Sequence, residues 1–159
     1  MLVRNSEIES LLDRGVKYVE SILTDSKRVD PTAIVETKED LYIVTMPPVE
    51  AADDDEAREA FRKAIEDVVA KSAPESVTVI TEVWWNAMPR LTSESAPNRN
   101  LRREGVVIHV EIPGGSRAAM AHVSRLGDAG FVDAWHEVSD AFVSGLTGFL
   151  DGFDGVHVN

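Results

Sequence analysis

The first part of the chain repeats apolar residues every three or four positions. This spacing places them on one face of a helix, and Ser6 followed by Glu9 has the form of a capping box. The polar stretch that ends at Pro31 stops the pattern. The sequence therefore predicts an amphipathic helix from Ser6 to about Thr24, with a buried stripe of Ile8, Leu11, Leu12, Val16, Val19, Ile22 and Leu23.

Two short runs of β-branched and aromatic residues follow, at 33–37 and 41–46, on either side of Lys38-Glu39-Asp40. Runs of this kind around a short polar segment are typical of a β-hairpin. A second helical pattern then covers residues 57–69. The acidic run 53–56 precedes it, and carboxylates in a first turn stabilise a helix through its dipole.

Residues 77–85 have a strong strand pattern. Successive side chains of a strand point to opposite faces of the sheet. Large apolar groups therefore occur on both faces, which predicts a central strand. One face carries Val77, Val79, Val83 and Trp85, and the other carries Ile80, Glu82 and Trp84.

A second hairpin is predicted from residues 106–112 and 117–123, because Gly114-Gly115 between them supplies the positive φ angles of a tight turn. The expected register places Ile112 opposite Arg117 and Val106 opposite Val123. The final pattern has helical spacing and predicts a C-terminal helix without Lys or Arg, formed by Phe131, Ala134, Trp135, Val138, Phe142, Leu146, Phe149 and Leu150.

These elements predict an α+β fold. It consists of a largely antiparallel five-stranded sheet, made of two hairpins and a central strand, with three helices packed on it. The helix between the first hairpin and the central strand permits one crossover connection. We expect residues 1–150 to form a single domain and residues 151–159 to form a tail.

Charge and composition narrow the classes of function. The chain has 159 residues and a formal net charge of -12, and a field of that sign repels phosphate backbones and anionic lipids. We therefore expect neither nucleic acid nor membrane as a partner. Cysteine is absent, which excludes disulfides, thiolate catalysis and Cys-ligated metals. We see no secretory signal and no apolar stretch near the ~18 residues of a transmembrane helix, so we expect a cytoplasmic protein.

One candidate site lies on the second hairpin. In the expected register His109 and Glu111 are neighbours on one face, and His122 lies diagonally across at a Cβ separation of about 5 to 8 Å. Two imidazoles and a carboxylate are ligand types of catalytic zinc and non-haem iron. The alternative is a polar sheet face that carries two histidines, and a shift of one residue in register would separate them.

The second candidate site is the long segment 86–103. Connections beyond about 12 to 15 residues are usually functional or disordered, and this one brings four arginines into an acidic chain. Arginine binds carboxylate or phosphate, and an indole offers a stacking face. We expect a pocket for a small anionic or nucleotide-like ligand, unless these arginines pair with acidic helices. The residues are Glu82, Trp84, Arg99, Arg102 and Glu104.

A sequence pattern links this segment to its flanking strands. Thr81-Glu82-Val83-Trp84 is followed by Glu94-Ser95-Ala96-Pro97-Asn98-Arg99 and then by Arg103-Glu104. The pattern spans about residues 77–111 and resembles one in small bacterial proteins to which no activity is assigned. This chain departs from it at Trp85 and at 100–102. The resemblance implies that Glu82, Trp84, Arg99 and Glu104 belong together.

The leading hypothesis is a small interaction protein that acts as a homodimer. The C-terminal helix and the two hairpins each offer a helix face or a strand edge to a second copy. A protein that binds small anions and a metal-dependent enzyme are the alternatives, and the sequence leaves open whether the chain is an enzyme and which cofactor it uses. Five Lys against eleven Arg, with 28 acidic residues, also suits a salt-rich habitat, in which net charge reports solubility.

Overall fold

The structure is a computed structural model, and it describes residues 2–25, 29–46, 54–86, 102–126, 129–139 and 146–150. Two helices lie in these ranges, α1 (Leu2–Asp25) and α2 (Asp54–Ser72). The strands are β1 (Thr32–Glu36), β2 (Leu41–Thr45), β3 (Ser76–Asn86), β4 (Arg102–Ile112), β5 (Gly115–Leu126), β6 (Ala129–Val132) and β7 (His136–Val138).

The strands form one antiparallel sheet. Its order is β2-β1-β3-β4-β5-β6, and β7 pairs with a different stretch of β5 from β6. The first hairpin and the central position of β3 are as predicted from the sequence. The prediction of five strands and three helices is wrong, because the described residues hold two helices and a seven-stranded sheet. The broader α+β character holds.

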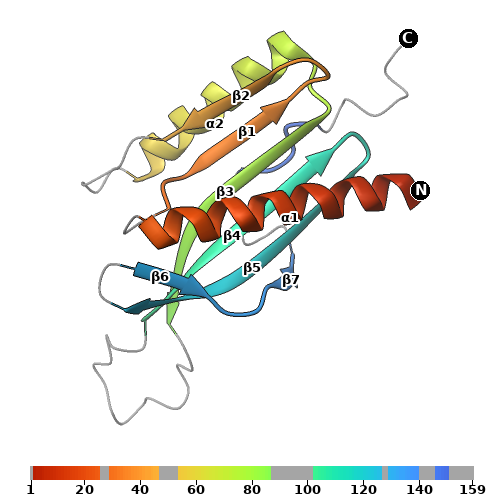
Figure 1. The fold of residues 1–159 in the computed structure, drawn as a ribbon. Coiled ribbons are helices and arrows are strands. Elements are labelled where there is room, and N and C mark those ends of the chain that lie inside the picture. The colour runs from red at the N-terminus through yellow and green to blue at the C-terminus, as the bar shows by residue number, and fades with distance from the viewer. Residues whose placement is uncertain are drawn as a thin grey trace.

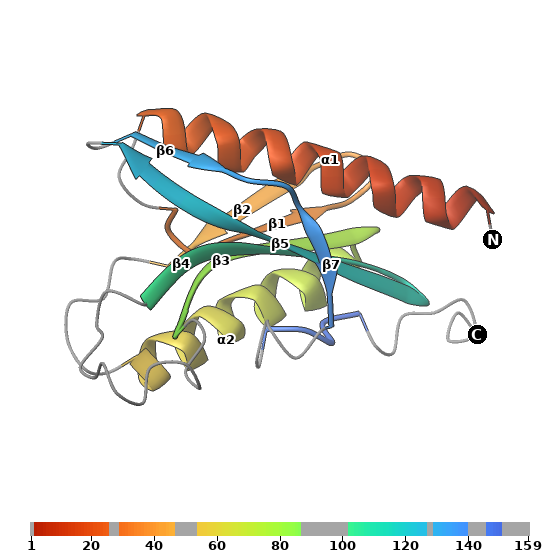
Figure 2. The ribbon, with the colours of Figure 1, turned by 90° about the horizontal axis from the view of Figure 1, so that it is seen from below.

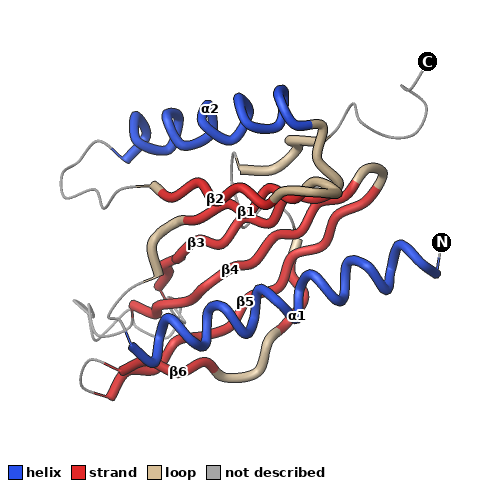
Figure 3. Tube along the Cα trace, turned by 45° about the horizontal axis from the view of Figure 1, so that its top comes forward, coloured by secondary structure: helices blue, strands red, loops and turns tan. Residues whose placement is uncertain are grey.

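The two helices lie on opposite faces of the sheet, as Figure 2 shows. Helix α1 runs diagonally across one face and packs mainly on β4, β5 and β6, with a smaller contact to β3 (Figure 1). Helix α2 packs on the other face against β1 and β2 (Figure 3). Each helix therefore covers a different half of the sheet.

Two apolar cores fill the spaces between the sheet and its covering elements. Alternation along β3 divides them, because Val77 and Val79 point to the face of α2 whereas Ile80 points to the face of α1. The core on the α2 face contains Ala33, Val35, Phe61, Ile65, Val69, Val107, Ala118, Leu146, Phe149 and Leu150. The core on the α1 face contains Ile8, Val19, Leu23, Val29, Val106, Ile108, Val110, Ile112 and Val123.

Helix α1 approaches the sheet most closely at Gly15. A Cβ atom placed there would lie 3.0 Å from Cγ2 of Ile108 on β4, so the absence of a side chain lets the helix backbone come close to the strand. The predicted end of this helix agrees with the structure. The predicted start does not, because the helix begins at Leu2, four residues before Ser6.

The β4–β5 hairpin is tighter than expected. Its turn is Pro113-Gly114, with Gly114 at a φ of 87°, and Ile112 pairs with Gly115 rather than with Arg117. Proline presets φ for the first turn position and glycine accepts the positive φ of the next, so the turn closes two residues earlier. A shift of two residues preserves which side chains share a face.

The predicted C-terminal helix is wrong over the residues that the structure describes. Residues 129–132 and 136–138 are strands that pair with β5, and 146–150 is an irregular segment. Phe131, Val132 and Val138 fit a pleated sheet as well as a helix stripe. Gly148 has a φ of 82°, which a right-handed helix does not allow. Phe142 lies outside the described residues.

Arg117 ties three elements together. It lies on β5 and contacts Glu137 on β7, with Nη2 and Oε1 3.3 Å apart, and Glu9 on α1, with Nη1 and Oε2 3.5 Å apart. Hydrogen bonding to Glu137 is the main cause that raises the pKa of Arg117 above its usual value. Neither helix of the described chain has the length and hydropathy to cross a membrane.

Candidate functional site

The three predicted metal ligands are not brought together. His109 and Glu111 lie on β4 and are buried, with 1% and 4% exposure. His122 pairs with Gly105, four residues along β4 from His109, which corresponds to about 13 Å along the strand. Among the described residues, no group of three His, Asp or Glu side chains is arranged to hold a metal ion.

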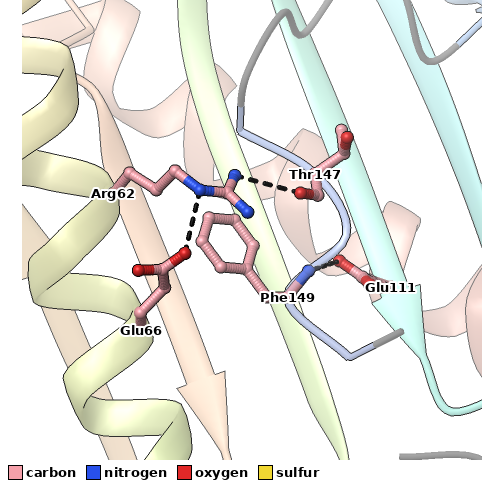
Figure 4. Close-up of polar contacts among 5 residues, drawn as sticks. All are labelled: Arg62, Glu66, Glu111, Thr147 and Phe149. Atoms are coloured by element: carbon pink, nitrogen blue, oxygen red, sulfur yellow. Dashed lines mark hydrogen bonds and ion pairs between the residues drawn. The ribbon is translucent and has the colours of Figure 1, made fainter. Parts of the chain in front are cut away.

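Glu111 instead binds the backbone of the C-terminal segment 146–150. Its Oε1 accepts a hydrogen bond from the amide of Phe149 at 3.1 Å (Figure 4). Its Oε2 accepts one from the amide of Leu150 at 2.8 Å. Leu146, Phe149 and Leu150 are buried in the core on the α2 face. A carboxylate that accepts two backbone bonds is well suited to a buried position.

Helix α2 holds the same segment from its other side. The guanidinium of Arg62 lies 4.6 Å from the ring centroid of Phe149, and its Nη1 donates to the carbonyl of Thr147 at 3.1 Å. Glu66 accepts a bond from Nε of Arg62 at 3.0 Å and orients it (Figure 4). The segment is thus fixed between β4 and α2, and Glu111 has a structural role here.

The predicted anion pocket falls partly outside the described residues. Arg99 and most of the segment 86–103 lie there, and so do the side chains of Trp84 and Arg102, although their backbones belong to β3 and β4. Glu82 lies on β3, and its Oε2 accepts the amide of Val29 at 3.2 Å, which ties β3 to the connection between α1 and β1. The pocket stays a prediction.

Glu104 pairs with an arginine that the sequence analysis did not single out. Arg125 on β5 contacts it through two bonds, from Nε to Oε1 at 3.1 Å and from Nη2 to Oε2 at 2.5 Å. Nine percent of the Glu104 side chain is exposed. The hairpin contained a signal for this pair, since Val106 pairs with Ala121 and positions 104 and 125 therefore lie diagonally across the two strands on one face.

The feature that stands out on the surface is the edge strand β2. In the described part of the chain it pairs with β1 and with no other strand. Leu41 is 50% exposed and Ile43 is 59% exposed. Val44 packs against the core on the α2 face, so alternation directs Leu41, Ile43 and Thr45 to the face of α1.

Helix α1 does not cover this part of its own face. It packs on β3 to β6, and the side chain of Arg14 reaches β1, where its Nη2 lies 2.6 Å from Oε1 of Glu36. Ile34 lies beside Ile43 in the β1–β2 register. Leu41 and Ile43, with the partly buried Ile34 beside them, therefore form an apolar area that is open to solvent next to α1. We call it the β2 face.

A second exposed apolar pair lies at the opposite end of the sheet. Leu126 on β5 is 73% exposed and Phe131 on β6 is 51% exposed. Phe131 pairs with Ser124, so it shares a face with Leu126, two positions along. This is the face of α2, but α2 lies over β1 and β2. Two side chains form this area, whereas three contribute to the β2 face, and α1 packs against β6 from the other side.

An open hollow of about 410 Å³ lies between the β1–β2 turn and the end of α2. Two hydroxyls in its wall are already bonded, because Thr37 Oγ1 accepts the amide of Asp40 at 2.8 Å and Ser72 Oγ donates to the carbonyl of Val68 at 2.7 Å. Its charges are of both signs, so it presents no single charge to a ligand. The wall consists of Thr37, Lys38, Glu39, Asp40, Tyr42, Lys71, Ser72, Ala73 and Glu75.

The sequence predicts the β1–β2 hairpin and offers its edge as one of several contact surfaces, but it does not predict the exposure of Leu41 and Ile43. Residues 41–44 are apolar without alternation, which usually indicates a strand buried on both faces. The signal in the sequence was the pair of prolines that follows at 47–48, because proline is tolerated at sheet edges. An edge strand that remains apolar on its open face is a feature of interaction surfaces.

Comparison with known proteins adds no relative to this description. No protein-family model, no curated protein sequence and no solved structure matches the chain. The resemblance of residues 77–111 to small bacterial proteins therefore stays an expectation. The geometry of the described residues carries the functional argument.

Proposed function

We propose that this protein is a small interaction protein that acts as a homodimer, and that its subunits associate through β2. The observation that carries the proposal is Ile43, a large apolar side chain that is 59% exposed on an edge strand. Strands of this kind join other strands through their backbone groups, with affinity from hydrogen bonds and specificity from side chains. Strand β2 supplies the backbone groups, and the β2 face supplies the side chains.

The distribution of charge supports β2 over other surfaces. Each copy carries a net charge of -12, so two copies repel each other at long range. Association then needs a contact area without like charges. Residues Leu41–Thr45 contain no charged side chain, and Leu41 and Ile43 lose apolar exposure when a second chain covers them.

The test compares molar mass in solution for three proteins. We expect the wild type to be a dimer by light scattering at micromolar concentration. Ile43→Lys places a charge in the contact, and we expect it to weaken the dimer at least about tenfold. Leu126→Lys makes the same change at a more exposed apolar position, and we expect the wild-type mass.

Circular dichroism of each variant checks that the fold is retained, which is expected because both positions are largely exposed. A monomeric wild type overturns the proposal. Loss of the dimer in Leu126→Lys together with its retention in Ile43→Lys moves the interface to the other end of the sheet.

A further inference from the structure

The direction of the backbone groups of β2 defines how a second strand can pair with it. Two hydrogen bonds at the ends of the β1–β2 ladder set the alternation: the amide of Thr37 donates to the carbonyl of Asp40, and the amide of Met46 donates to that of Pro31, both at 2.9 Å. In an antiparallel ladder, hydrogen-bonded pairs alternate with pairs that are not bonded.

Counting residue pairs inward from either end of the ladder identifies the same hydrogen-bonded pairs. The pairs of Tyr42 with Val35 and of Val44 with Ala33 direct their backbone groups toward each other. The amides and carbonyls of the residues between them point away from β1, toward the free edge. These residues are Leu41, Ile43 and Thr45.

This outward row ends at both sides. Toward the turn, the amides of Glu39 and Asp40 both donate to Oγ1 of Thr37, at 3.2 and 2.8 Å. Toward the other end, the sequence continues after Met46 with Pro47, which has no amide hydrogen. Within the described part of the chain, the free donors of the edge are therefore those of Leu41, Ile43 and Thr45, and Ile43 is the centre of the row.

We propose that the partner of β2 is the β2 strand of a second copy, paired antiparallel about a two-fold axis at Ile43. This inference rests on the proposed function and specifies its interface. Ile43 then pairs with Ile43 of the other copy, and Leu41 pairs with Thr45. All three pairs are of the hydrogen-bonded kind, and two bonds per pair give about six.

Other two-fold registers are less favourable. In an antiparallel pair the facing side chains lie on one side of the sheet, so the axis must pass through a residue. An axis at Tyr42 or at Val44 aligns two of the three outward positions, which gives about four bonds within the strand. The register at Ile43 also places Asp40 opposite Met46, so that no like charges face each other.

The side chains agree with this register. Ile34 lies beside Ile43 in each copy, so the axis brings four isoleucines into one row across the joined sheets, on the face that α1 leaves open. Cross-strand pairs of β-branched residues stabilise a sheet. A second copy therefore covers the Ile43 side chain and also forms hydrogen bonds with the amide and carbonyl of Ile43.

Single cysteine variants test the register, because the chain has no native cysteine. Cα atoms of a hydrogen-bonded antiparallel pair are about 5.5 Å apart, within the range of a disulfide. Under mild oxidation we expect Ile43→Cys to form a covalent dimer. Leu41→Cys, Tyr42→Cys and Thr45→Cys alone should remain monomers on denaturing gels, whereas a mixture of the Leu41 and Thr45 variants should cross-link.

Any result other than these overturns the inference. If Leu41→Cys or Tyr42→Cys cross-links with itself and Ile43→Cys does not, the register is wrong, although the proposed function stands as long as light scattering shows a dimer. Equal cross-linking of Leu126→Cys, the control at the far end of the sheet, indicates random collision. A monomer by light scattering removes the proposed function and the register together.

Discussion

Glu111 illustrates how a single side chain holds a distant part of the chain. It is 4% exposed, and its two oxygens accept the amides of Phe149 and Leu150. Truncation leaves both amides without this acceptor inside the core on the α2 face, and each buried group left unsatisfied costs about 1 to 3 kcal/mol. We therefore expect Glu111→Ala to lower the free energy of unfolding by about 2 to 6 kcal/mol in urea titrations.

Two further variants make this measurement specific. Glu111→Gln keeps one acceptor oxygen and should lose less than Glu111→Ala. Glu137→Ala removes a carboxylate whose side chain is 63% exposed, and such changes usually stay within about 0.5 kcal/mol. Equal losses for Glu111→Ala and Glu137→Ala would show that the 146–150 segment does not depend on Glu111.

Ala73 provides a second prediction at the residue scale. It follows α2 with a φ of 49°, a conformation that costs a residue with a Cβ atom about 1 to 2 kcal/mol. Glycine adopts it freely. Ala73→Gly should therefore stabilise the protein by up to about 1 kcal/mol, whereas Ala70→Gly within α2 should destabilise it by a similar amount. Thermal unfolding of both variants checks the opposite signs.

Part of this residue-scale description could be predicted from the sequence. The side chains of His109 and Glu111 share a face as expected, since alternation survives a shift of two residues. The contacts of these two side chains could not be predicted. The turn at Pro113-Gly114 shifts the β4–β5 register by two residues from the predicted one and places His122 opposite Gly105. The bonds of Glu111 to Phe149 and Leu150 link positions 38 and 39 residues apart, and no local pattern encodes them.

At the scale of elements, the contact between α1 and β4 depends on Gly15. A new Cβ would meet Ile108 at 3.0 Å, and a longer side chain would push the helix from the sheet. We expect Gly15→Leu to cost about 1 to 3 kcal/mol, the usual cost of overpacking. Lys17→Leu adds a similar side chain on the exposed side of α1 and should have little effect on urea unfolding. A neutral Gly15→Leu would mean that α1 packs less closely than described.

Elements with one local signal were predictable, and elements whose pattern fits two structures were not. The first hairpin follows from its β-branched and aromatic runs around a polar turn, β3 follows from its strand pattern, and α2 follows from helical spacing. The segment from Phe131 to Leu150 also has helical spacing, yet β6 and β7 form there because β5 offers them an edge to pair with. Tertiary pairing decides between helix and strand when the local propensities are close.

At the scale of the whole molecule, charge opposes the proposed dimer. Two copies that each carry -12 repel each other, and salt screens this repulsion as the Debye length falls from about 30 Å at 0.01 M to about 8 Å at 0.15 M. The contact itself is apolar. We therefore expect the dimer to tighten several-fold over this range, measured as the dissociation constant by sedimentation equilibrium. Weakening with added salt would instead indicate ion pairs across the interface.

The most direct test of the interface is amide hydrogen exchange along β2 of the wild-type protein at two concentrations. The amides of Tyr42 and Val44 bond to β1 in any state and serve as internal references. We predict that the amides of Leu41, Ile43 and Thr45 are protected at high concentration and lose protection on dilution, while the references do not change. Fast exchange of these three amides at every concentration would contradict association through β2.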